Sequence, residues 1–279
     1  MRIVVTGAGG MLGGRVVAVA EAREIEVIAF GRDDADITDA DAITAAISDA
    51  APDAVINCAA YTDVDGAEAD EAVALAVNGT GAGNVAAAAA AAGARIVHVS
   101  TDYVFDGVND HPWVESDPTR PLGAYGRTKL AGEHEVAIAT ADHAIARTAW
   151  LFGAGGKNFC DTMLRLGSER DFVSVVTDQV GCPTWTGHLA PALLDLAAAD
   201  ATGVFHTAAA GQCSWFALTL ELFKRAGLEC EVRKTTSAEF VRPAARPAWS
   251  VLESERPQTP RLPRWQQGVA EHLSETISR

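Results

Sequence analysis

The stretch Arg2-Ile3-Val4-Val5-Thr6-Gly7-Ala8-Gly9-Gly10-Met11-Leu12-Gly13 indicates a nucleotide-binding turn between a strand and a helix. Its first part is a short β-rich run, and residues 11–23 have the character of a helix. Gly7, Gly10 and Gly13 would permit a tight turn, close approach of backbone N–H groups to a pyrophosphate, and close helix–strand packing. The spacing is G-x-x-G-x-x-G rather than G-x-G-x-x-G, so a glycine-rich turn without function is the alternative.

Strands and helices alternate along the first 150 residues. Asp39 can cap a helix that runs to about Ala50, and Gly93 can end a long helical region that closes with the alanine run 86–92. This alternation predicts an α/β fold of the Rossmann-like type, with a doubly wound parallel sheet. The further strands are expected at residues 26–30, 53–57, 95–99 and 143–149.

The character of the chain changes after Trp150, where shorter elements and several prolines follow. We therefore predict a Rossmann domain over residues 1–150 and a smaller C-terminal α/β substrate-binding lobe over 151–279, with segments near 200–212 returning to the first domain. Helices are expected at about 158–166, 188–199 and 214–226, and strands near 171–176 and 203–207.

The net charge of the chain limits the classes of partner that it can bind. It carries 22 Lys and Arg against 37 Asp and Glu, a net charge of −15, which argues against nucleic acid or an anionic membrane as a partner. The five cysteines lack a CxxC pair and are expected to be reduced thiols rather than a disulfide frame or a zinc site. We see no leader and no apolar stretch long enough to span a bilayer, so the expected location is the cytoplasm.

Tyr125 and Lys129 are one helical turn apart in Tyr125-Gly126-Arg127-Thr128-Lys129. Residues at i and i+4 share a helix face, so both side chains can point into one site. A tyrosine titrates near pH ~10 in water, and we expect the nearby ammonium to lower its pKa towards working pH, which suits a proton donor. The alternative is a surface pair on an amphipathic helix.

The end of the second predicted strand bears on the cofactor. Many NAD-binding proteins place an acid there, where it binds the adenosine ribose hydroxyls. This chain has Gly31 and Arg32, and an arginine can bind a 2′-phosphate. NADPH is therefore expected, with NADH possible because Asp33, Asp34 and Asp36 are near.

Several motifs together resemble a known family. TGxxGxxG at residues 6–13, YxxxK at 125–129 and Ser100-Thr101 at the end of the fourth strand are similar to those of extended short-chain dehydrogenases/reductases. Longer strings narrow the resemblance to the dTDP-4-dehydrorhamnose reductase family, over essentially the whole chain. They are NCAAYTDVD at 57–65, STDYVFDG at 100–107, YGRTKLAGE at 125–133, RTAW at 147–150, DQVGCPT at 178–184, GVFH at 203–206 and RPAWSVL at 246–252 with Trp265.

The resemblance implies a set of site residues. Tyr125 would be the proton donor, Lys129 would hold the nicotinamide ribose, and Thr101 would bind the substrate carbonyl oxygen. Thr101, Asp102, Tyr103 and Trp150 would line the sugar site, with Asn158 and Gln179 towards the nucleotide. The cofactor would lie along Gly7, Gly10, Met11, Leu12, Gly13, Arg32, Asp36, Ile37, Ala59, Ala60, Tyr61, Asn78, Tyr125 and Lys129.

The implied activity is NADPH-dependent reduction of the C4 keto group of dTDP-4-dehydro-6-deoxy-L-mannose (dTDP-4-dehydro-β-L-rhamnose) to dTDP-L-rhamnose. One alternative is a related dTDP-deoxysugar 4-ketoreductase with the same catalytic set and a different sugar pocket. Another is a non-catalytic regulatory subunit on the same fold. The expected partner is the small nucleotide sugar, the chain being a monomer or a homodimer. Mg²⁺ is possible in this family, but no metal ligands can be placed in this sequence.

Overall fold

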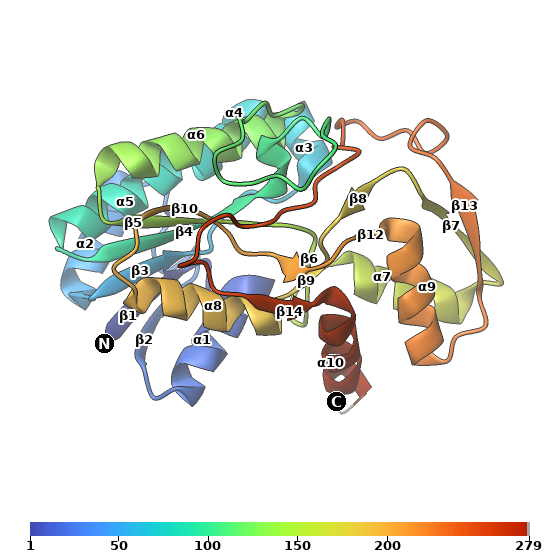
Figure 1. Cartoon of the computed structure of the whole chain (residues 1–279). Helices are drawn as coiled ribbons and strands as arrows, with labels where there is room; N and C mark the ends of the chain where they lie inside the picture. The colour runs from blue at the N-terminus through green and yellow to red at the C-terminus, as the bar shows by residue number, and fades with distance from the viewer. Residues whose placement is uncertain (278–279) are drawn as a thin grey trace.

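A six-stranded parallel sheet forms the centre of the protein, in the order β10-β5-β4-β3-β1-β2 (Figure 1). The computed structural model describes residues 1–277. The predicted parallel, doubly wound sheet is confirmed. Its strands are β1 (Arg2–Thr6), β2 (Glu26–Phe30), β3 (Ala54–Asn57), β4 (Arg95–Thr101), β5 (His143–Thr148) and β10 (Gly203–His206).

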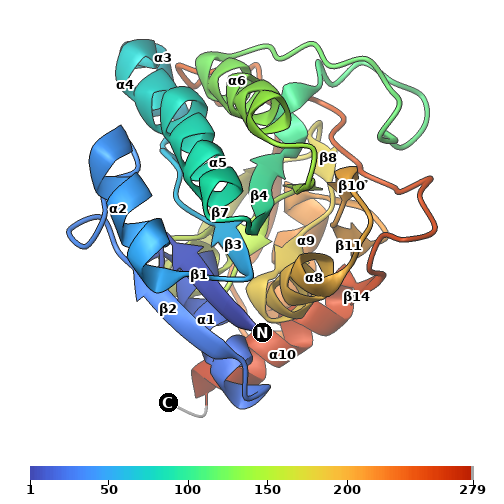
Figure 2. The same ribbon diagram turned by 90° about the vertical axis from the view of Figure 1, so that its left-hand side faces the viewer.

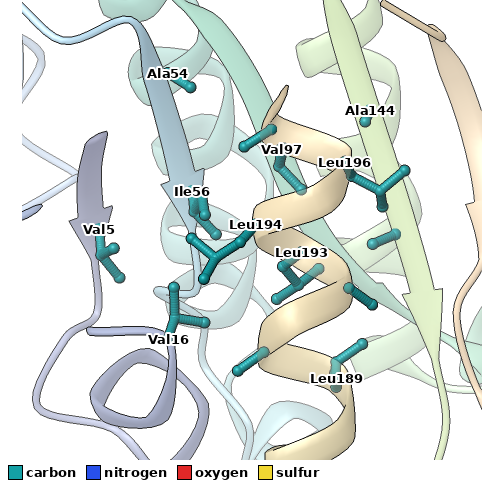
Figure 3. Packing of buried hydrophobic residues seen from close by; sticks show 14 of the residues in the cluster. Val5, Val16, Ala54, Ile56, Val97, Ala144, Leu189, Leu193, Leu194 and Leu196 are labelled. Atoms are coloured by element: carbon teal, nitrogen blue, oxygen red, sulfur yellow. The ribbon is translucent and has the colours of Figure 1, made fainter. Parts of the chain in front are cut away.

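Helices cover both faces of this sheet (Figure 2). Consecutive residues of a strand point to opposite faces, so Val4 and Val5 enter different cores, and both are fully buried. Helices α1 (Met11–Ala22) and α8 (Thr186–Ala198) cover one face, where Val16 and Leu193 pack among the sheet residues that Figure 3 shows. The other face is covered by α2 (Ala40–Ala50), α5 (Ala82–Ala91) and α6 (Ala124–Ala139).

A nearly continuous helical run leads into α5. It consists of α3 (Val64–Ala69), α4 (Glu71–Leu75), the π-helical turn η1 (Ala76–Gly81) and α5 itself. By length and composition alone, residues 71–91 are apolar enough to cross a membrane, so the expectation that no such stretch exists was wrong. About 50% of that window is buried inside the protein, against α2 and α6. Such burial is what the core helix of a globular domain shows.

The remaining elements gather at the carboxyl end of the sheet (Figure 1). Helices α7 (Phe159–Glu169) and α9 (Trp215–Ala226) pack together beside a small parallel sheet of β7 (Phe172–Val176) and β13 (Glu231–Thr235). The helix α10 (Trp265–Ile277) packs against α9. The short elements are η2 (Asp102–Val104), β6 (Leu151–Phe152), β8 (Val180–Gly181), β9 (Thr184–Trp185), β11 (Ala209–Ala210), β12 (Cys213–Ser214) and β14 (Leu262–Arg264).

The chain returns to the main sheet at α8, which packs against β3 and β4, and continues into the edge strand β10. This return begins at Thr186, earlier than the segment near 200–212 that we expected. The division into a nucleotide-binding and a substrate-binding part stays a prediction.

Candidate active site

A cavity of about 930 Å³ lies at the carboxyl ends of the central strands. The chain runs from β1 outwards to β2 and then crosses to β3 on the other side of β1. Such a reversal of strand order opens a crevice between the loops, which is the usual ligand site of open α/β sheets. The cavity is lined by the glycine turn after β1, by loops after β2, β3, β4 and β5, by α6, and by Trp215 of α9.

The glycine turn is tight enough to exclude larger residues. Gly7 has φ +66°, and a Cβ there would lie 2.6 Å from the backbone nitrogen of Ala59. A Cβ on Gly13 would lie 2.2 Å from the carbonyl oxygen of Gly7. Gly10 caps α1 without a side-chain hydrogen bond, so the helix presents its first N–H groups to the cavity. A turn of this shape fits a pyrophosphate.

The loop after β2 lines the cavity with Arg32 and Asp36. The Arg32 side chain is 84% exposed, and its Nε lies 3.3 Å from the Asp36 carboxylate. Asp36 also accepts hydrogen bonds from the backbone nitrogen and hydroxyl of Thr38, and these bonds, with that from Arg32, lower the pKa of Asp36. Arg32 is thus an exposed cation beside a carboxylate whose charged form is favoured.

Thr101, Asp102 and Tyr125 all line the cavity. The Thr101 hydroxyl donates to Asp102 Oδ1 at 3.0 Å. Asp102 Oδ2 is buried and has no hydrogen-bond partner among the described residues. Burial raises the pKa of Asp102 to about 6, although the hydroxyls of Ser250 and Thr101 act to lower it. This carboxyl group is therefore an acceptor, or a donor when protonated, that a ligand in the cavity can satisfy.

The pKa of Tyr125 does not move in the direction that the sequence argument expected. Burial, with a contribution from the charge of Asp102, raises the pKa of Tyr125 to about 12, although the Thr101 hydroxyl acts to lower it. The expected lowering by Lys129 was wrong for this structure, because the lysine nitrogen is directed towards β4. Lys129 Nζ donates to the carbonyl oxygen of Val99 at 2.7 Å and lies 3.4 Å from His98 Nε2.

Lys129 itself is 2% exposed, and burial lowers its pKa to about 8. The charge of Glu133, one turn further along α6, acts in the opposite direction. Glu133 is held by two hydrogen bonds from Arg147 of β5 and one from Ser100 of β4. This buried network attaches α6 to the sheet directly behind the cavity.

Two glycines let α6 approach its neighbours. A Cβ on Gly126 would lie 2.2 Å from the carbonyl oxygen of Tyr103, and one on Gly132 would lie 2.0 Å from that of Asn78. Asn78 is buried in η1 and binds both backbone groups of Tyr61 and the hydroxyl of Thr128. Asn78 is therefore not part of the cavity lining, and it connects the loop after β3 to α6.

Trp150 and Trp215 form an aromatic wall, with ring centroids 3.5 Å apart and planes within 3°. Trp215 Nε1 donates to Gln179 Oε1 at 3.1 Å, and Gln179 Nε2 donates to Ser237 at 2.8 Å. Gln179 thus supports Trp215 from behind and does not line the cavity. Trp215 was not among the predicted site residues, and its only signal in the sequence is an aromatic residue directly after the capping residue Ser214.

The Asn158 side chain forms its hydrogen bonds within its own loop and with the start of α7. Its Oδ1 accepts the backbone N–H of Asp161 at the start of α7, and its Nδ2 donates to the carbonyl oxygen of Gly153 at 2.9 Å. This shapes the loop that brings Gly155, Gly156 and Lys157 to the cavity. Lys157 was also missed, since a single lysine in a glycine-rich loop carries no pattern.

The structure brings most of the expected site residues to one cavity, while Asn78, Asn158 and Gln179 lie outside its lining. The residues that line it are Gly7, Gly10, Met11, Leu12, Gly13, Arg32, Asp36, Ile37, Ala59, Ala60, Tyr61, Thr101, Asp102, Tyr103, Tyr125, Lys129 and Trp150. Their individual roles stay predictions.

A glycine turn at the crevice of a doubly wound sheet, with a threonine, tyrosine and lysine at its centre, defines an oxidoreductase of the extended short-chain dehydrogenase/reductase class. The family model described as "RmlD substrate binding domain" matches residues 1–278. The chain belongs to this family, that of the dTDP-4-dehydrorhamnose reductases.

Three relatives illustrate the similarity. A dTDP-4-dehydrorhamnose reductase of Streptomyces griseus is 45% identical over 91% of this chain and 86% of its own length. A dTDP-4-keto-6-deoxy-D-glucose reductase of Streptomyces niveus is 44% identical, over 90% and 88%. The crystal structure of the Bacillus anthracis dTDP-4-dehydrorhamnose reductase in complex with NADP has a TM-score of 0.95 and 35% identity, and covers 98% of this chain and 99% of that one.

Proposed function

We propose that the protein reduces the C4 keto group of dTDP-4-dehydro-6-deoxy-L-mannose with NADPH and forms dTDP-L-rhamnose. The observation that carries this proposal is the convergence of Thr101, Tyr125 and Lys129 in one cavity with the glycine turn. The names of the Streptomyces griseus relative and of the NADP-bound Bacillus anthracis structure support the reaction and the cofactor.

The residues present fit the cofactor. The turn at Gly7, Gly10 and Gly13 suits the pyrophosphate, because side chains are excluded and helix N–H groups face the cavity. Arg32 would bind the 2′-phosphate, and Lys129 would hold the nicotinamide ribose. When bound, NADPH supplies the hydride that goes to the sugar carbon.

Proton transfer falls to Tyr125. A phenol with a pKa of about 12 stays protonated at neutral pH and is still a stronger acid than the alcohol of the product. Tyr125 gives its proton to the former carbonyl oxygen, so the sugar gains a hydroxyl and the tyrosine becomes a phenolate that solvent reprotonates. Thr101 positions that oxygen. Lys129 does not lower the pKa of Tyr125, so its proposed role is to hold the nicotinamide ribose.

The rest of the cavity would bind the nucleotide sugar. Trp150 and Trp215 offer a flat apolar face, and Tyr103 and Asp102 offer polar groups beside it. Lys157 is an exposed cation at the cavity in a chain of net charge −15, so it can attract a diphosphate locally. Asn158 and Gln179 would act indirectly, through the Lys157 loop and Trp215.

A related dTDP-deoxysugar 4-ketoreductase is the second candidate. It is favoured by the 44% identity to the Streptomyces niveus dTDP-4-keto-6-deoxy-D-glucose reductase. The catalytic residues would be the same in both enzymes. The regulatory-subunit alternative has the same fold but predicts no turnover.

The test is product analysis after incubation with the 4-keto sugar nucleotide and NADPH. We expect NADPH oxidation and, by NMR, a product with the L-rhamnose configuration at C4. Oxidation that yields the opposite C4 configuration would support the second candidate. Binding of NADPH without turnover of any dTDP-4-keto sugar would contradict both, and Tyr125→Phe is the control for non-enzymatic oxidation.

A second comparison tests whether the enzyme recognises the nucleotide part of its substrate. Remote contacts to the diphosphate and base position the sugar, so a 4-keto sugar 1-phosphate should lose kcat as well as affinity. Equal kcat/KM for the dTDP sugar and the 1-phosphate would remove the nucleotide-sugar assignment.

The cellular compartment, the oligomeric state and the metal binding of the protein are part of this proposal. We expect a cytoplasmic monomer or homodimer. Within residues 1–277, no group of three or more His, Cys, Asp or Glu side chains is arranged to hold a metal ion.

A further inference from the structure

A row of buried polar side chains lies behind the active site and ends at Lys129. The Thr6 hydroxyl donates to Asn57 Oδ1 at 2.7 Å, Asn57 Nδ2 lies 3.1 Å from His98 Nδ1, and His98 Nε2 lies 3.4 Å from Lys129 Nζ. The four residues come from β1, β3, β4 and α6, and each is nearly or fully buried. Only Lys129 reaches the cavity. Thr6, Asn57 and His98 have no role in the proposed reaction.

The orientation of the Asn57 amide is set by a backbone group. The N–H of Ala59 donates to Asn57 Oδ1 at 3.1 Å, beside the Thr6 hydroxyl. A backbone N–H can only donate, so a flipped amide would place two donors face to face. Oδ1 therefore points towards Ala59, and Nδ2 donates towards His98.

This orientation selects one form of His98. Its Nδ1 faces the donor Nδ2 of Asn57 and must be an acceptor without a proton. Burial, together with the charge of Lys129, holds the pKa of His98 well below its ordinary range, so the ring is neutral. A neutral ring with a bare Nδ1 carries its proton on Nε2, and this N–H points at the lysine nitrogen.

We propose that His98 is a positioning residue that presents an N–H donor to Lys129, and that this contact weakens the hold of Lys129 on its proton. A charged ammonium has only donors and would face the His98 N–H as a second donor. A neutral amine would accept that N–H while it still donates to Val99. The contact therefore favours the neutral amine, as burial also does.

The other groups around Lys129 either favour its charged form or do not distinguish the charged from the neutral form. Glu133 on the same helix attracts a proton to Lys129, but Arg147 of β5 already pairs with Glu133. Cys58, after β3, acts in the same direction as Glu133 only when it is ionised, and burial raises the pKa of Cys58 to about 12. The carbonyl oxygen of Val99 accepts from either form of the amine. His98 is thus the described neighbour that distinguishes the two forms by hydrogen-bond geometry.

The consequence for activity rests on the proposed function, in which the ammonium of Lys129 holds the nicotinamide ribose for hydride transfer. Activity then falls as pH rises through the pKa of Lys129, which is about 8. If the His98 N–H is removed, the ammonium loses its opposing donor and that pKa rises. The alkaline limit of kcat/KM would move to higher pH.

The tautomer can be measured without any activity. The chain has seven histidines, so ¹⁵N-histidine labelling gives few NMR signals, and His98→Gln assigns the one that disappears. We expect a neutral ring protonated on Nε2 between pH 6 and 9. A ring protonated on Nδ1, or an imidazolium at pH 7, would overturn the proposal.

Activity profiles give the second measurement. In His98→Leu, which has no donor, we expect the alkaline pKa of kcat/KM to rise by about one unit. Ile96→Val is the matched control, because Ile96 is buried two residues earlier on the same strand face and should leave this pKa in place. Loss of stability with an unchanged pH profile in His98→Leu would show a merely structural role.

Asn57→Asp tests the mechanism from the other side. One carboxylate oxygen can still accept from Ala59, while the other faces His98 Nδ1 and favours a proton there. The NMR signal should change to the Nδ1-protonated form, and an unchanged tautomer would contradict the role given to Asn57. The NMR measurement of the His98 tautomer does not depend on which reaction the enzyme catalyses. The proposal for His98 and the proposed function can therefore be refuted independently.

Discussion

Trp150 and Trp215 stack in parallel, 3.5 Å between ring centroids, although one follows β5 and the other begins α9. Trp150 has φ +49°, a left-handed conformation that is rare for a bulky residue. Its ring lies against Gly181, where a Cβ would be 2.5 Å from the indole. A strained backbone held by tight packing beside a cavity is typical of a binding site.

Trp215→Ala should raise KM for the nucleotide sugar about 10-fold, the scale of one aromatic stacking partner lost from the wall. NADPH affinity should stay the same, because Trp215 belongs to α9 and not to the glycine turn or the loop after β2 that are assigned to the cofactor. Steady-state kinetics measure the first, and fluorescence titration with NADPH the second. Trp215→Phe keeps a ring and should lose less. An unchanged KM in the alanine variant would remove Trp215 from the substrate site.

Tyr125→Phe should lower kcat by roughly 10²-fold or more while the fold and the NADPH affinity stay nearly intact, since only the proton donor is lost. Lys129→Met should damage both kcat and cofactor affinity, because the ribose contact assigned to Lys129 both holds the cofactor and places its nicotinamide for hydride transfer. Rapid single-turnover measurements separate the two effects. Wild-type turnover in Tyr125→Phe would exclude this residue as the proton donor.

Arg32→Ala should reduce the preference for NADPH over NADH about 10-fold, within the range of 1–3 kcal/mol for a charge-assisted contact. The effect is expected at the lower end because Arg32 is 84% exposed and already faces Asp36. The ratio of kcat/KM for the two cofactors is the measurement. Arg165→Ala, an exposed arginine on α7, is the control. If Arg32→Ala and Arg165→Ala show the same ratio of kcat/KM for NADPH and NADH, Arg32 does not bind the 2′-phosphate.

Gly13→Ala should destabilise the protein by about 1–3 kcal/mol and weaken NADPH binding, since the new Cβ would lie 2.2 Å from the carbonyl oxygen of Gly7. Gly14→Ala is the matched control on the next residue of α1, where the nearest atom to a Cβ is 3.3 Å away. Its free energy of unfolding should change by less than about 1 kcal/mol. Urea unfolding and NADPH titration distinguish the two variants. Equal behaviour would show that the turn can relax.

Asp65 connects α3 to the segment before β14 by accepting hydrogen bonds from Arg242, Arg246 and the N–H of Ala244. Burial acts to raise the pKa of Asp65, but the bonds from Arg246, Ala244 and Arg242 outweigh it and hold that pKa at about 2, below the ordinary 3.8. The charged form is therefore favoured in the folded state. Its contribution to stability is complete well above pH 4 and is lost as pH falls towards 2.

Asp65→Asn should accordingly lower the free energy of unfolding at pH 7 by about 2 kcal/mol. The difference from wild type should shrink between pH 4 and pH 3. Urea unfolding at several pH values measures it, and Asp63→Asn is the control, since asparagine can also cap α3. A difference that does not depend on pH in this range would show that charge is not the cause.

The sequence by itself determined the features that depend on neighbours within a few residues. The strand, glycine turn and helix at residues 2–22 follow from local propensity and from contacts of Gly7 and Gly13 inside one turn. Helix periodicity placed Tyr125 and Lys129 on one face of α6, and the alternation of elements predicted the parallel sheet.

The tertiary structure alone decided which distant groups meet and how deeply they are buried. Helix spacing could bring Lys129 to the same face as Tyr125, but the packing of α6 on β4 directs its nitrogen to Val99 and His98. Burial then raises the pKa of Tyr125, and no pattern in the sequence predicts how deeply this residue is buried. Trp215 reaches Trp150 only because α9 folds over the end of the sheet. Patterns in a sequence define faces of elements, whereas partners across elements follow from the packing of the whole chain.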